Sequence, residues 1–209
     1  MFEEERWCAA WRALGANPPD GLLAEVVLRY GAAGRHYHTL QHLGECFAML
    51  DGARHLAERP AELELALWFH DAVYDTRAHD NEASSAAWAE RSLIAGGASE
   101  AVGWRLSELI LATKHDAVPG DPDTRLLVDV DLSILGADVS RFDEYERQVR
   151  REYAWVPDDA FRVGRARVLS AFLERRSIYD TKWFIERLEH RAQANLNRSL
   201  RALLTGAAP

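Results

Sequence analysis

Apolar residues recur at intervals of three and four along almost the whole chain, whereas alternating β-branched stretches are nearly absent. This spacing puts apolar side chains on one face of a helix and predicts an all-α protein. Breaks rich in Gly, Pro and Asp divide the chain into about nine or ten helices. The breaks lie at residues 17–21, 31–34, 59–60, 96–97, 119–122, 136, 157–159 and 177–181.

None of these breaks is long enough for an interdomain linker. We therefore expect one domain over residues 1–209, with a core of motifs at about 30–140 and C-terminal helices at about 138–204. One helix should begin at Pro60 and continue through residues 63–75, because proline suits the first helical turn. The seven tryptophans occupy helical positions and are expected in the core.

The net charge of the chain limits which kinds of molecule its surface could bind. The 209 residues include 25 basic and 33 acidic side chains, for a net charge of −8. This balance argues against a surface built for long nucleic acid. The first 140 residues hold 23 of the acids and 11 of the bases, so the remainder is mildly arginine-rich. Those arginines are interpreted as solvated helix faces, with anion binding as the alternative.

The apolar runs, the first residues and the cysteine content indicate the cellular compartment. No apolar run approaches the roughly 20 residues of a membrane span, and the first residues are acidic where an export signal would be basic. Cys8 and Cys46 are too few for a disulfide framework or a cysteine zinc site. We expect a cytoplasmic protein that does not associate with membranes.

Histidines and acids interrupt three apolar segments. His38 and His42 are four residues apart and would share a helix face, as metal ligands often do, although two histidines on a partly polar face give the same pattern. His70 and Asp71 directly follow an apolar run. A buried His-Asp doublet is costly unless it is paired internally or holds a metal ion.

A third apolar segment, residues 125–136, contains Asp129 and Asp131. A spacing of two prevents both from facing one point on a helix, so one of them is expected at the site. Two imidazoles and two carboxylates suit a divalent transition metal better than calcium or magnesium. Mn, Fe, Co, Ni and Zn are not distinguished by this donor set.

In these motifs the chain resembles the HD-domain superfamily, specifically its small bacterial metal-dependent phosphohydrolases. That family has a His, a later His-Asp doublet and a distal Asp on an all-α fold. The resemblance covers roughly residues 30 to 200. The matching segments are residues 35–42, 67–75, 80–86, 109–116, 129–136 and 149–173.

The resemblance implies that His42, His70, Asp71 and Asp131 bind one metal ion. Asp131 is chosen over Asp129 because a Leu and a short apolar run follow it. His38 is assigned to a substrate-facing or supporting role. A second metal is in doubt, because His115 alone falls short of the binuclear pattern unless His79 or Glu82 contributes.

The implied reaction is hydrolysis of a small phosphate ester or nucleotide by a metal-activated water. Asp71 would orient that water and His115 would protonate the leaving oxygen. Arg35 and Lys114 would neutralise phosphate charge, or else be solvated cations at helix ends. Arg162 and Arg165 are weaker candidates for the same role.

Three other functions stay open: a nucleotide- or metal-binding sensor, a binuclear-iron oxygenase of the HD type, and a helical protein with a structural metal. Cys46 lies one turn after His42 and could approach the site, but it is interpreted as a small buried hydrophobe. Residues 183–200 form an amphipathic segment that suits either core packing or a homodimer contact.

Overall fold

The computed structural model describes residues 3–115 and 120–205. These residues form ten α-helices and two short 3₁₀ helices and contain no strand, which confirms the all-α prediction. Asp116, part of the break at 119–122 and the last four residues lie outside the described part of the chain. No described helix combines the length and apolar character needed to span a membrane. The chain divides into two compact units, Met1–Val130 and Asp131–Pro209.

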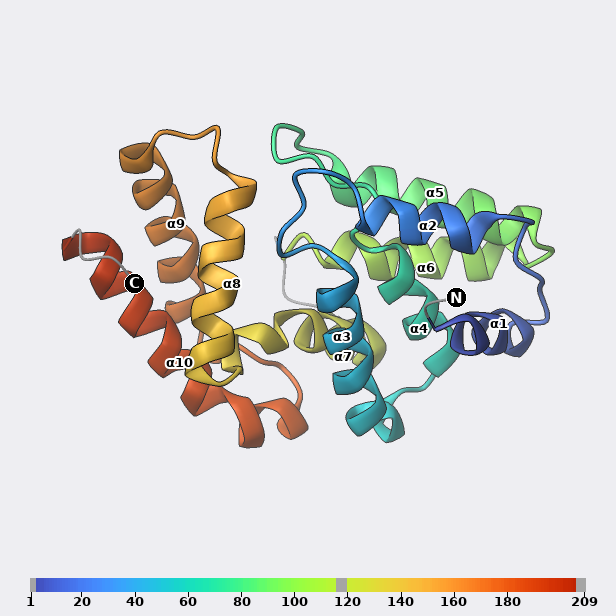
Figure 1. The fold of residues 1–209 in the computed structure, drawn as a ribbon. Helices are drawn as coiled ribbons and strands as arrows, with labels where there is room; N and C mark the ends of the chain where they lie inside the picture. The colour runs from blue at the N-terminus through green and yellow to red at the C-terminus, as the bar shows by residue number, and fades with distance from the viewer. Residues whose placement is uncertain (1–2, 116–119, 206–209) are drawn as a thin grey trace. The chain divides into compact units, whose positions relative to one another are not determined.

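The first unit contains the helices that precede the boundary (Figure 1). They are α1 (Glu4–Ala13), α2 (Leu22–Tyr30), α3 (Leu40–Ala53), η1 (Arg54–Leu56), α4 (Pro60–Phe69), α5 (Asn81–Ala95), α6 (Glu100–Ala112) and most of α7 (Pro122–Asp131). Helix α5 packs along α6, and α4 packs on α1, α3 and α6. The boundary between the two units lies between Val130 and Asp131, the last two residues of α7. Asp131 is therefore continuous with the nine preceding residues of that helix, which belong to the first unit.

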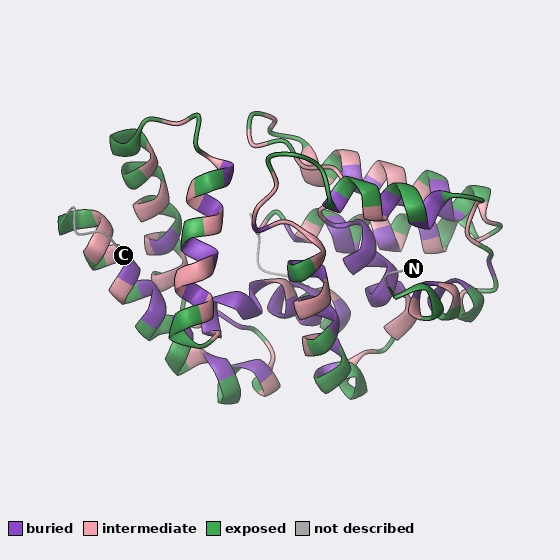
Figure 2. Cartoon of the chain, viewed as in Figure 1, coloured by how far each residue is buried: buried purple, intermediate pink, exposed green. Residues whose placement is uncertain are grey.

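Helix α4 is the centre of the first unit. Every residue from Glu62 to Phe69 is buried, as the purple of this helix in Figure 2 shows. The two acids in this stretch are compensated, because Arg105 pairs with Glu62 while Arg6 and Arg54 pair with Glu64. Burial of both acids next to arginines avoids the cost of isolated buried charge.

Tryptophans fill the space around this helix. Trp7, Trp11 and Trp68 are almost fully buried, and the edge of Trp7 meets Trp68 at a centroid distance of 5.2 Å. Trp104 and Trp155 are 60% and 49% exposed, so the expectation that the tryptophans lie in the core is wrong for these two. Helical spacing in the sequence does not show which face of a helix packs against the rest of the protein.

The second unit contains η2 (Leu132–Gly136), α8 (Val139–Glu152), α9 (Asp158–Leu173) and α10 (Lys182–Thr205). Helix α10 packs against η2 and α9. The amide of Asn195 donates hydrogen bonds to the carbonyls of Leu135 and Ala137, both 2.9 Å long. Helix α9 is different, because Leu169 is its only buried residue among sixteen.

Candidate metal centre

His42 and His70 approach each other in the interior of the first unit. The two Nε2 atoms are 3.2 Å apart, and the residues are 2% and 1% exposed. His42 lies in the first turn of α3, where the side chain of Thr39 caps the helix by accepting from the amide of Gln41. His38 precedes this cap, so the prediction that His38 and His42 share one helix is wrong.

The doublet lies just beyond the end of α4. The helix ends at Phe69, so it does not continue through Asp71 to residue 75 as the apolar pattern suggested. His70 and Asp71 instead occupy the turn that follows. Several contacts hold this turn. The amide of Ala72 donates to the Phe69 carbonyl, and the Ser85 hydroxyl of α5 bonds both the amide and the carbonyl of Val73.

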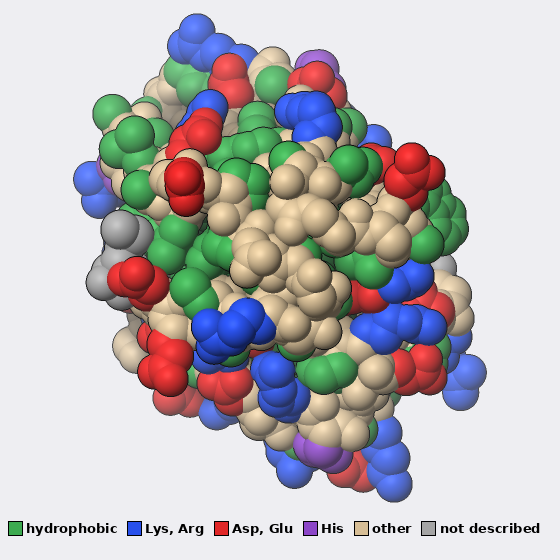
Figure 3. Space-filling model, turned by 90° about the vertical axis from the view of Figure 1, so that its right-hand side faces the viewer, with side chains coloured by type: hydrophobic (Ala, Val, Ile, Leu, Met, Phe, Trp, Pro, Cys, Tyr) green, Lys and Arg blue, Asp and Glu red, His purple; other side chains and the backbone are tan. Residues whose placement is uncertain are grey.

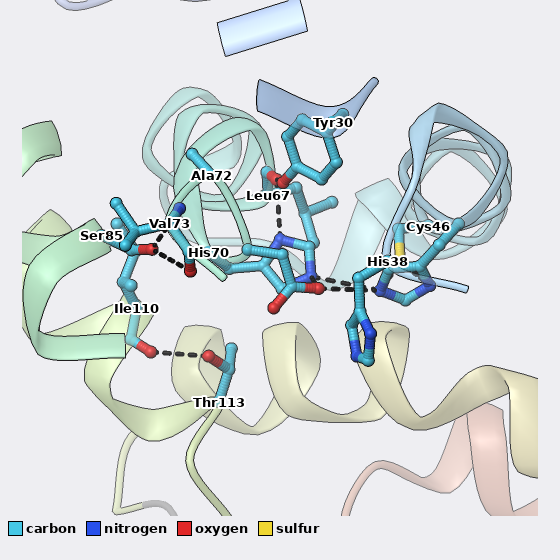
Figure 4. Close-up of polar contacts among 12 residues, drawn as sticks. Tyr30, His38, Cys46, Leu67, His70, Ala72, Val73, Ser85, Ile110 and Thr113 are labelled. Carbon is cyan, nitrogen blue, oxygen red and sulfur yellow. Dashed lines mark hydrogen bonds and ion pairs between the residues drawn. The ribbon is translucent and has the colours of Figure 1, made fainter. Parts of the chain in front are cut away.

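The ring of His70 is oriented by the backbone. Nδ1 lies 2.8 Å from the Leu67 carbonyl oxygen, to which the Tyr30 hydroxyl also donates at 3.4 Å. A carbonyl only accepts, so Nδ1 carries a proton, and in the neutral imidazole Nε2 then keeps its lone pair. In Figure 4 the ring of His70 points from the end of α4 toward the helix that carries Cys46.

Asp71 completes a triangle of ligand atoms. Its Oδ2 lies 3.1 Å from Nε2 of His70 and 3.5 Å from Nε2 of His42. Metal bonds of 2.0–2.2 Å at tetrahedral or octahedral angles separate neighbouring N and O ligands by about 3 to 3.5 Å. The three separations therefore match adjacent vertices of a coordination sphere.

The surroundings of Asp71 favour the ionised form of its carboxyl group. Burial opposes its ionisation, but the nearby His70 and His38 and the hydrogen bonds with His42 and His70 outweigh this effect and hold its pKa well below the usual range. Such a carboxylate can accept a hydrogen bond or bind a cation.

A second group of potential ligands shares both histidines with the triangle and includes the end of α7, but Asp71 is not a member of it. His42, Cys46, His70 and Asp131 each offer one atom, and these atoms all lie within 4.8 Å of one another. Asp131 is the member of the Asp129–Asp131 pair that joins this group, while Asp129 is completely buried in α7. Cys46 is buried, as expected for a small hydrophobe, but it also belongs to the cluster, which the sequence interpretation had set aside.

Arg35 lies beside the doublet and binds backbone. Its guanidinium donates to the carbonyls of Asp71 and Ala72 at 2.6 and 2.9 Å, and to that of His38 at 3.2 Å. The group therefore ties the segment before α3 to the turn after α4. The same cation lies over the rings of Tyr30 and Tyr74.

Aromatic rings surround His38. Its ring stacks on Tyr74 at a centroid distance of 4.1 Å and meets the edge of Tyr37 at 4.8 Å. The ring centroids of His38 and His42 are 6.0 Å apart. His38 thus lies next to the ligand triangle, with part of its surface exposed.

The remaining predicted residues lie at the end of α6. Lys114 and His115 follow the last turn of this helix, and His115 has a left-handed backbone with φ of 61°. His115 is not a member of the four-residue group found among the described residues. His79 and Glu82 are not members either, so this group contains no second-metal set.

The arginines of α9 have local partners. Arg165 pairs with Glu146 and donates to the Tyr145 hydroxyl, and Arg162 pairs with Asp159 on its own helix. These contacts account for both side chains without an anion.

No protein-family model, curated protein or solved structure matches this chain. The structure therefore supports an all-helical protein with a buried His/Cys/His/Asp group that can hold a metal ion.

Proposed function

We propose that this protein is a metal-dependent phosphohydrolase acting on a small phosphate ester or nucleotide. One observation carries the proposal: the Nε2 atoms of His42 and His70 and Oδ2 of Asp71 form a triangle with edges of 3.1 to 3.5 Å. Asp131 adds a second carboxylate close to both histidines. Two neutral imidazoles and two carboxylates make a typical donor set for a divalent transition metal.

The donor set fits the metal that the resemblance implies. Ligation requires a neutral imidazole with a free lone pair, and the Leu67 carbonyl fixes that tautomer in His70. When bound, a divalent ion supplies Lewis acidity that polarises a phosphoryl oxygen and lowers the pKa of water. The four residues His42, His70, Asp71 and Asp131 would hold it.

The remaining steps fall to side chains near this triangle. We assign Asp71, which is 18% exposed, to orienting the attacking water through its carboxylate. His115 would deliver the proton to the leaving oxygen, and Lys114 and His38 would contact the phosphate ester. Arg35 is better suited to positioning Asp71 than to binding phosphate, because its guanidinium donates to three backbone carbonyls.

Surface charge favours a small substrate over a polyanion. In the face drawn in Figure 3, Lys and Arg side chains are interspersed with Asp and Glu. Binding of long nucleic acid depends on clustered basic residues that release counterions. A net charge of −8 disfavours such binding further.

The test is elemental analysis of the purified protein beside His70→Ala, Asp71→Ala and Asp131→Ala. We expect about one transition metal per chain in the wild type and loss of that metal in each variant. His55→Ala and Asp20→Ala, at exposed positions of the same unit, serve as controls and should keep the metal. The loaded protein is then screened for phosphate release on a panel of nucleotides and simple phosphate esters.

The outcomes separate the functions considered. Metal loss in the three variants together with phosphate release supports a hydrolase, and Asp71→Ala should release no phosphate. Metal binding without turnover would overturn hydrolysis in favour of a sensor or a structural metal. Two irons per chain with oxygen uptake would indicate an oxygenase. Absence of metal under all loading conditions would mean that the doublet is an internally satisfied core network.

A further inference from the structure

Cys46 is the one member of the four-residue group that the His/His-Asp/Asp ligand set does not use. It is 1% exposed and lies one helical turn beyond His42 on α3. Its Sγ is 3.7 Å from both Nδ1 and Nε2 of His42, and within 4.8 Å of the ligand atoms offered by His70 and Asp131. Figure 4 shows Cys46 on the helix toward which the ring of His70 points.

We propose that Cys46 is a thiolate ligand of the metal and selects Zn²⁺ over Mn²⁺ and Mg²⁺. This inference rests on the proposed metal site. Cysteine sulfur is a soft donor that favours Zn²⁺ and Co²⁺, whereas carboxylate oxygens alone favour harder ions. A single thiolate in the site would therefore decide which ion is retained.

The separations allow this ligation. A Zn–S bond of 2.3 Å beside a Zn–N bond of 2.0–2.1 Å places sulfur about 3.1 to 3.6 Å from the neighbouring nitrogen. The distance of 3.7 Å to Nε2 of His42 is slightly longer than this range. Because the sulfur is equally far from both ring nitrogens, it lies beside the ring and moves toward the metal on binding. Rotation about the Cα–Cβ bond of Cys46 provides that movement without a change in the backbone.

The charges of the site also balance with a thiolate. Asp71, Asp131 and a Cys46 thiolate contribute three negative charges. A divalent ion contributes two positive charges, and the guanidinium of Arg35, bonded to the Asp71 carbonyl at 2.6 Å, contributes a third. A buried group of charges is far less costly when its sum is zero.

The experiment compares Cys46→Ser with Cys8→Ser, which removes the other, partly exposed cysteine. Each protein is loaded with Co²⁺, and the near-ultraviolet charge-transfer band of a thiolate–Co²⁺ bond is measured. Wild type and Cys8→Ser should show the band, and Cys46→Ser should bind Co²⁺ without it. Because the band is read in the wild type and in Cys8→Ser, the test does not depend on Cys46→Ser folding well.

Competition titrations supply the second readout. We expect Cys46→Ser to bind Zn²⁺ at least about 100-fold more weakly, while its affinity for Mn²⁺ changes by less than about tenfold. A purely structural defect would lower the affinity for Zn²⁺ and for Mn²⁺ by the same factor. Equal losses of affinity would therefore overturn the proposal.

The remaining outcomes distinguish the two proposals. Co²⁺ binding to the wild type without a thiolate band would overturn ligation by Cys46 and leave the proposed function intact. Failure of the wild type to bind any transition metal would overturn both.

Discussion

The Nδ1 atom of His70 donates to the carbonyl oxygen of Leu67, three residues earlier, across 2.8 Å. This bond determines which ring nitrogen of His70 faces His42. It depends on the end of α4, because the helix stops at Phe69 and leaves the Leu67 carbonyl without a helical donor from its own C-terminal side. The end of α4 at Phe69 thus leaves the Leu67 carbonyl available to His70, and this bond orients Nε2 of His70 toward His42.

Arg35, which binds the backbone carbonyls of His38, Asp71 and Ala72, should affect metal affinity without being a ligand. Arg35→Gln removes the donors to the Asp71, Ala72 and His38 carbonyls, so the Asp71 turn loses an anchor. We expect a 10- to 100-fold weaker metal affinity, of about the size seen for residues that orient ligands. Isothermal titration with Zn²⁺ measures it. Arg29→Gln, which breaks an exposed pair with Glu25 and a cation–π contact with Trp88, is the control, and unchanged affinity in Arg35→Gln would rule out this role of Arg35.

Asn195 should stabilise the second unit through its two hydrogen bonds to the segment at residues 135–137. Asn195→Ala leaves two carbonyls without these donors in a buried position, at a cost of about 2 kcal/mol in the free energy of unfolding. Asn197→Ala, at an exposed position of the same helix with one bond to Gln193, should change it by less than about 0.5 kcal/mol. Urea denaturation of both variants measures the difference, and equal effects would contradict the assignment.

Replacing only one partner of the buried Arg165–Glu146 ion pair should lower the free energy of unfolding strongly. The two side chains are 9% and 8% exposed, and Ser199 also donates to Glu146. Arg165→Met leaves a buried carboxylate and should lower the free energy of unfolding by about 3 to 5 kcal/mol. Adding Glu146→Leu should restore part of this loss, because the unpaired charge is removed as well. A double variant no more stable than the single one would show that the contribution of Arg165 is not electrostatic.

Alkaline pH should destabilise the protein through two buried tyrosines. Burial raises the pKa of Tyr30, with Asp71 adding to the effect, and burial also raises the pKa of Tyr145 against the influence of Arg165. In the unfolded chain tyrosine ionises near pH 10, so above about that pH the folded state holds more protons than the unfolded state. The free energy of unfolding should therefore be unaffected by these groups below about pH 9 and fall as pH rises through 10.

Denaturant unfolding at a series of pH values tests this expectation. Tyr30→Phe should reduce this fall in the free energy of unfolding, because one of the two ionising groups is removed. An unchanged slope in Tyr30→Phe would show that Tyr30 does not contribute.

Sequence periodicity predicted the helices well but not where they end. The apolar run of α4 continues through His70 and Asp71 in the sequence, yet the helix stops at Phe69, because the arrangement of the following turn depends on Ser85 and Arg35 from other segments. Such long-range hydrogen bonds leave no periodic signal. The start at Pro60, by contrast, is a local effect of proline and was predicted correctly.

The candidate ligands could be named from sequence, but their grouping could not. Spacing alone could not decide between Asp129 and Asp131, and the resemblance supplied the choice. Cys46 was set aside because a cysteine in an apolar helix is commonly a small core residue. Its offset of four residues from His42 was the signal that places it on the same face of α3. The backbone partners of Arg35 and His70 have no sequence signature at all.

Helix α9 has few buried residues, and this should make it open more readily than the rest of the protein. Apart from Leu169 and the Arg165–Glu146 pair, this helix buries little, so its opening free energy should be below that of α4, which is buried from Glu62 to Phe69. In native-state hydrogen exchange its amides should exchange early, and limited proteolysis should cut there first. Such early opening would leave the buried helix α4, which His70 and Asp71 directly follow, protected on the same timescale.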